Sequence, residues 1–157
     1  VCQTSSTLFN AVARANLEIV YRSPHAWPSS YVEKGMDATV NWPNLDFKFR
    51  NNTDYPVFIV AYYAKQKVTV EIYGVGLQDG MTIDLQSVVT KTIPAPEGTK
   101  YVQNTNLPAG TQKDTVKART GYVVETYQVW YKNGVEVSRN LLCTSTYKAY
   151  QKTVEYN

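Results

Sequence analysis

The feature that most constrains the fold of this chain is a repeated alternation of apolar and polar residues in strand-length segments. Residues 45–50 place an apolar side chain at every second position, the pattern of a strand with one buried face. Asn133-Gly134 joins two further predicted strands, 122–132 and 135–142. This pair favours a two-residue hairpin turn, because both central positions need positive φ. The sequence therefore predicts antiparallel hairpins as the main building unit.

Further strands are predicted by the same reasoning, and only one helix. The expected strands are residues 17–21, 57–64, 67–73, 81–93 and 111–118, with 57–64 and 67–73 paired through Lys65-Gln66.

Residues 4–15 are predicted to form the helix, because apolar side chains recur there at helical spacing. Hydroxyls of residues 4–6 are expected to cap its start, and Asn16 is expected to end it in the left-handed conformation. Residues 22–42 are expected to form a long loop in which 37–40 pair with a sheet, and a loop of this length is often functional.

Composition narrows the classes of protein to consider. The 157 residues are 43% apolar, which supports a folded core, and the net charge of +3 is spread without a basic stripe, so no nucleic-acid partner is expected. No apolar run is long enough for a membrane span. Two cysteines without a CxxC motif exclude a structural zinc site, and neither a metal nor a cofactor is expected. Cys2 and Cys143 could form a disulfide, but two unrelated thiols are the favoured interpretation.

The first half of the chain resembles a known family. The run Val-Cys-Gln-Thr-Ser-Ser-Thr-Leu-Phe-Asn-Ala at residues 1–11 resembles the most recognisable motif of VanW-like proteins, in which glycines precede the Val-Cys-Gln. Pro24-His25, the Gly-Met-Asp-Ala-Thr-Val of 35–40 and the segment 45–53 continue the resemblance in order. The glycines and the N-terminal half of the usual domain are not in this chain, which implies a truncated VanW-like domain at 1–78.

The second half resembles the five-glycine (G5) domain that often follows VanW-like domains. Its matching points are Leu-Pro-Ala-Gly-Thr at 107–111, Gly121-Tyr122 and the segment 132–139, although Ala-Arg-Thr stands at 118–120 where a glycine is expected. The combination implies an α+β chain that is mainly β, with one N-terminal helix and antiparallel strands followed by an elongated all-β module at 79–157.

The two resemblances imply a place and a set of partners. They point to an extracellular Gram-positive protein, held at the cell wall or membrane through segments outside this chain. The chain starts at Val1 rather than Met, so it is expected to be a fragment or processed product. The implied partners are peptidoglycan or N-acetylglucosamine-containing glycans, with self-association through the second domain. VanW-like proteins are associated with glycopeptide-resistance clusters, and the family supplies no settled activity.

One group of residues could carry catalysis. Cys2 lies just before the predicted helix, whose N-terminus would favour a thiolate, while His25 could act as base and Asp37 could orient its ring. The alternative interpretation is a small buried thiol and a loop histidine bonded to backbone. Asp46 and Asp54 are expected to be solvated or in turns.

Another group could bind sugars. Trp27, Tyr31 and Trp42 lie in or beside the long loop, and aromatic faces stack well on the apolar faces of sugar rings. The same rings could instead cover the helix and sheet. Three functions therefore stay open: noncatalytic binding or organisation of peptidoglycan or its sugars, a Cys2-dependent peptidoglycan peptidase or transferase, and a structural or adhesive stalk.

Overall fold

The computed structural model describes all residues, 1–157, and is mainly β with a single helix. The prediction of an α+β, mainly β chain is confirmed. In chain order the elements are α1 (Cys2–Arg14), β1 (Glu18–Tyr21), β2 (Lys48–Arg50), β3 (Phe58–Ala64), β4 (Lys67–Tyr73), β5 (Met81–Ile93), β6 (Thr99–Gln103), β7 (Gln112–Val116), β8 (Gly121–Lys132), β9 (Val135–Tyr147) and β10 (Lys152–Tyr156).

Helix α1 begins two residues earlier than its hydroxyl-rich sequence predicts. Its N-cap is Val1, which makes no side-chain capping bond, so the predicted cap at residues 4–6 is wrong. Ser5 and Ser6 lie inside the helix, and their hydroxyls donate instead to the carbonyl of Ala38 at 2.6 and 3.3 Å. The predicted end of the helix is confirmed, because Asn16 adopts the left-handed conformation with a φ of 56°.

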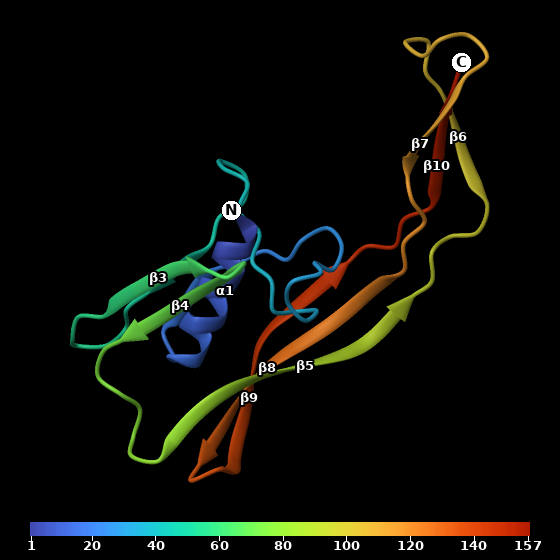
Figure 1. Cartoon of the computed structure of the whole chain (residues 1–157). Helices are drawn as coiled ribbons and strands as arrows, with labels where there is room; N and C mark the ends of the chain where they lie inside the picture. The colour runs from blue at the N-terminus through green and yellow to red at the C-terminus, as the bar shows by residue number, and fades with distance from the viewer.

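The body of the molecule is a helix held between two layers of strands. Figure 1 shows α1 between the β3–β4 hairpin and the long β5–β8–β9 sheet, and α1 contacts both β4 and β5. One small apolar cluster lies at the helix–sheet contact and consists of Ala13, Met36 and Leu85, with Ile19, Val32 and Leu142 packed against it. The helix therefore supplies the layer that covers one face of the long sheet.

The long sheet is antiparallel, with β8 in the centre. Asn133 and Gly134 have φ values of 49° and 81°, so the predicted β8–β9 turn is confirmed. Lys65 and Gln66 also have positive φ, 50° and 61°, in the predicted β3–β4 hairpin.

A slender arm extends from this body. In Figure 1 it is the three-stranded sheet β6–β10–β7, which projects away from the helix. Strand β10 pairs parallel with β6 and antiparallel with β7. Strands β6 and β10 were not predicted, because nearly all of their side chains are exposed or half-buried and show no alternation. We call residues 94–120 and 148–157 the arm.

The long loop packs directly on the long sheet. At Gly35, with φ of +85°, an added Cβ would lie 2.4 Å from Thr126 Oγ1 and 2.9 Å from Val124 Cγ1, so only glycine fits against β8. The prediction of a strand at 37–40 is wrong, since these residues pair with no sheet. Side chains bind this backbone instead, among them Ser6, whose hydroxyl accepts from the Ala38 N–H at 2.9 Å.

Candidate functional site

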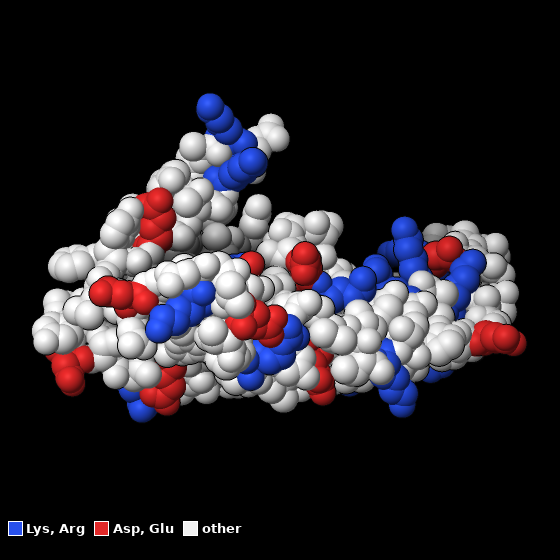
Figure 2. Space-filling view, turned by 90° about the horizontal axis from the view of Figure 1, so that it is seen from below, with Lys and Arg blue, Asp and Glu red and all other residues white.

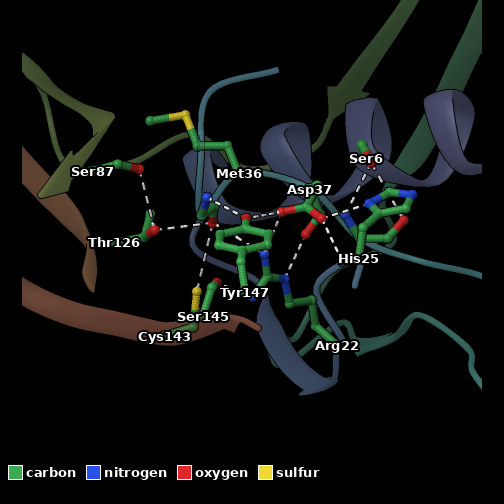
Figure 3. Close-up of polar contacts among 12 residues, drawn as sticks. Ser6, Arg22, His25, Met36, Asp37, Ser87, Thr126, Cys143, Ser145 and Tyr147 are labelled. Atoms are coloured by element: carbon green, nitrogen blue, oxygen red, sulfur yellow. Dashed lines mark hydrogen bonds and ion pairs between the residues drawn. The ribbon is translucent and has the colours of Figure 1, made fainter. Parts of the chain in front are cut away.

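The most elaborate polar cluster surrounds Asp37, whose side chain is only 1% exposed. The Oδ1 atom accepts from Arg22 Nη2 at 3.1 Å and from the Tyr147 hydroxyl at 2.5 Å. The Oδ2 atom lies 2.7 Å from the backbone nitrogen of His25 and 2.5 Å from His25 Nδ1. Figure 3 shows the carboxylate between Tyr147 and Arg22 on one side and His25 on the other.

This environment keeps Asp37 ionised. Burial alone would raise the pKa of its carboxyl, but hydrogen bonds from Tyr147 and His25, with the positive charge of Arg22, hold that pKa below its usual range. The opposite effect acts on the phenol, since burial and the hydrogen bond to Asp37 raise the pKa of Tyr147 far above its usual value. At neutral pH Tyr147 is therefore a protonated donor to an ionised Asp37 carboxylate.

Two distant parts of the sequence build this cluster together. Arg22 reaches Ser145 Oγ on β9 at 2.6 Å, and the Tyr147 hydroxyl also accepts from the Gly35 N–H at 2.7 Å. The Gly35 carbonyl in turn accepts from Thr126 Oγ1 on β8 at 2.9 Å. The geometry of the long loop therefore depends on β8 and β9. Neither Arg22 nor Tyr147 carries a local sequence signal for this role.

The predicted trio of Cys2, His25 and Asp37 is brought together in part. His25 and Asp37 form the expected pair, whereas the Cys2 thiol donates to the Val40 carbonyl at 3.5 Å and makes no hydrogen bond to His25. His25 Nε2 lies 3.3 Å from the Tyr31 hydroxyl. Partial burial, with smaller contributions from neighbouring Cys2 and Asp37, raises the pKa of Tyr31. Both cysteines are free thiols.

The predicted aromatic residues lie in separate places. Trp27 is 47% exposed and lines a cavity of about 390 Å³ with residues of the arm. Its ring meets Tyr150 edge to face at 6.1 Å between centroids, and the Arg119 guanidinium lies 4.4 Å from its centroid. We call this the junction cleft, lined by Trp27, Asp114, Thr115, Val116, Lys117, Arg119 and Tyr150.

Tyr31 and Trp42 lie outside that cleft. Tyr31 packs edge to face on His25, with 6.2 Å between ring centroids, and Trp42 is 77% exposed. Asp46 accepts from the backbone N–H of Phe47 at 2.8 Å, a local backbone contact. The cleft residues Tyr150 and Arg119 could not be found by sequence reasoning, because only the fold carries them to the long loop.

Comparison with known families confirms the two resemblances found in the sequence. Residues 1–73 match the family described as VanW like protein, and residues 86–156 match the G5 domain. The chain is a VanW-like segment followed by a G5 domain. The uncharacterized protein YoaR of Bacillus subtilis (strain 168) is 45% identical to the VanW-like segment over 73 residues, which are 46% of this chain and 24% of YoaR.

Two solved G5 structures are similar to part of this chain. The IgA1 protease G5 domain shares 25% identity and covers 48% of this chain and 87% of its own, with a TM-score of 0.31. The HP0197-G5 structure shares 18% identity and covers 49% of this chain and 97% of its own, with a TM-score of 0.24.

The two matches indicate a cell-wall-associated protein. Helix α1 lacks the length and apolarity needed to span a bilayer. The structure contains no cluster of three or more His, Cys, Asp or Glu side chains arranged to hold a metal ion. The structure therefore contains two candidate functional sites, the Asp37 cluster and the junction cleft, and each combines residues of both halves of the chain.

Proposed function

We propose that this protein binds peptidoglycan or its sugars at the cell wall without modifying them, and that the junction cleft is the binding site. The observation that carries the proposal is the position of Trp27, a half-exposed indole at the edge of a cavity. An aromatic surface beside polar side chains is the usual arrangement for holding a sugar ring.

The contacts of the cleft support a preformed site. The Trp27 ring is held in place by Tyr150 and Arg119, so little side-chain freedom is lost when a ligand arrives. The cleft also lies between the two halves of the chain, a frequent position for ligand sites. The VanW-like segment supplies the indole, and the G5 domain supplies the surrounding polar groups.

The test compares Trp27→Ala with the unchanged protein in titrations with purified muropeptides, followed by calorimetry. Loss of the indole is expected to weaken binding roughly tenfold, as removal of an aromatic contact costs about 1–1.5 kcal/mol. Tyr63→Ala is the matched control, because Tyr63 is a 71% exposed ring on β3, outside the cleft. Equal affinity in both variants, with unchanged melting temperatures, would remove Trp27 from the proposal.

A second function, a Cys2-dependent peptidoglycan enzyme, is favoured by the pairing of His25 with the buried Asp37. That pair could orient an imidazole for proton transfer, and the Tyr31 hydroxyl lies 3.3 Å from the other ring nitrogen of His25. The test is incubation of the unchanged protein and Cys2→Ser with muropeptides, read by mass spectrometry. A product formed only by the unchanged protein would establish the enzyme, and the absence of a product from both would dismiss it.

A further inference from the structure

The positive charge of this protein is concentrated on the arm. The arm holds six Lys and Arg residues against three Asp and Glu residues, so the entire net charge of +3 resides there and the rest of the chain is neutral. Figure 2 shows blue side chains where the arm meets the body. The six cations are Lys100, Lys113, Lys117, Arg119, Lys148 and Lys152. An anionic ligand would therefore be attracted to the part of the molecule that contains the junction cleft.

Two of these cations line the cleft without an ionic partner. Lys117 and Arg119 form no salt bridge, whereas the one carboxylate of the cleft wall, Asp114, lies 3.6 Å from Lys152 Nζ. The carboxylate of Asp114 thus already forms an ion pair with Lys152. The cleft keeps two positive charges available to a ligand.

Arg119 is oriented by its stacking on Trp27. The guanidinium carbon lies 4.4 Å from the centroid of the indole. A guanidinium over an aromatic ring keeps its N–H donors available for a bidentate bond to a carboxylate or phosphate. The contact therefore holds an aromatic ring that can pack on a sugar beside a guanidinium that can bind an anion.

From this juxtaposition we infer that the junction cleft recognises an anionic glycan, in which a sugar ring packs against Trp27 while its carboxylate or phosphate meets Arg119 and Lys117. This inference rests on the proposed function and narrows it. A neutral sugar such as N-acetylglucosamine would leave both cations without a partner. Peptidoglycan strands freed of their peptides carry a lactyl carboxylate on every second sugar and satisfy the requirement.

The experiment measures affinities of the full chain for three probes by calorimetry. The probes are peptide-free peptidoglycan strands, neutral chitotetraose, and polyglycerol phosphate, which carries anions but no sugar ring. The peptide-free strands are expected to bind about tenfold more tightly than chitotetraose, as one or two charge-assisted hydrogen bonds would provide. That preference should shrink as salt is raised from about 0.05 to 0.5 M, since added ions screen charge.

The variant Lys117→Gln/Arg119→Gln is expected to bind the peptide-free strands and chitotetraose equally. The matched control, Lys65→Gln/Lys67→Gln, removes two cations from the β3–β4 hairpin outside the arm and should keep the preference. Melting temperatures verify that each variant is folded.

The possible outcomes separate the two proposals. Equal binding of chitotetraose and peptide-free strands by the unchanged protein would overturn the anionic preference and leave the proposed function standing. Failure of every glycan to bind would overturn both. Binding of polyglycerol phosphate as tightly as the strands would show that charge alone acts, and would overturn the role given to the sugar ring.

Discussion

Replacing Tyr147 by Phe would remove one oxygen atom from the centre of the Asp37 cluster and leave the packing of the ring intact. Tyr147 is fully buried, and its hydroxyl both donates to Asp37 Oδ1 at 2.5 Å and accepts from the Gly35 N–H at 2.7 Å. The change removes one hydrogen-bond partner from the Asp37 carboxylate and one from the Gly35 N–H. Each such loss costs about 1–3 kcal/mol, and Arg22 still serves Oδ1, so we expect a destabilisation of about 2–4 kcal/mol.

The pH dependence of this loss follows from Asp37. Its folded pKa lies below the unfolded value, so its stabilisation is complete above roughly pH 5 and is lost as the pH falls through the folded pKa. The hydrogen bond from Tyr147 lowers that pKa, and its removal should raise the folded value. The difference in unfolding free energy between Tyr147→Phe and the unchanged protein should therefore be largest at neutral pH and become smaller below about pH 4.

The assay is urea unfolding followed by circular dichroism at pH 7 and at pH 3.5. The control is Tyr101→Phe, because Tyr101 is a 60% exposed ring on β6 whose hydroxyl makes no hydrogen bond within the protein. It should change stability by less than about 0.5 kcal/mol. An equal effect of the two substitutions at pH 7, or a Tyr147→Phe effect that grows as the pH falls, would refute the role given to the cluster.

Other substitutions and reagents test neighbouring features. Gly35→Ala should lower the unfolding free energy, measured by thermal unfolding, by about 2–4 kcal/mol, because the positive φ and the contact with Thr126 act together. Gly110 also has a positive φ, +73°, but its Cβ position faces open space, so Gly110→Ala should cost about 1 kcal/mol. Similar losses of stability in the two variants would contradict the packing argument. Burial raises the pKa of Cys143, so iodoacetamide should label it slowly below pH 8 and far more slowly than Cys2, as mass spectrometry of peptides can show. Rapid labelling of Cys143 would show that its thiol is not shielded as described.

Much of the body could be predicted, because its signals are local. The apolar residues Met81, Ile83 and Leu85 alternate with polar ones at the start of β5, and the conformations of Asn16 and of Asn133-Gly134 follow from the residue types themselves. The contact between His25 and Asp37 was one of two alternatives that the sequence left open, and the catalytic role of the pair stays a prediction.

The errors have a common physical cause, which is competition from distant partners. The hydroxyls of Ser5 and Ser6 bind the Ala38 carbonyl 33 and 32 residues away and so do not cap the helix. The same contacts hold the backbone near residue 38 away from any strand. Tyr147 is 110 residues from Asp37, and no periodicity links the two. Strand β6 is held by parallel pairing with β10, and this backbone pairing leaves no hydrophobic pattern in the sequence of either strand.

The most direct test of glycan binding at the junction cleft is a titration with peptide-free peptidoglycan strands, followed through the three Trp indole N–H signals in a proton–nitrogen NMR spectrum. Trp27 lies at the cleft, Trp42 is exposed elsewhere, and Trp130 donates to Asn140 Oδ1 at 3.0 Å on the long sheet. We predict a saturable shift of the Trp27 signal, with the Trp130 signal unmoved. A saturable shift confined to Trp42 or Trp130, or no shift at any of the three, would contradict binding at this cleft.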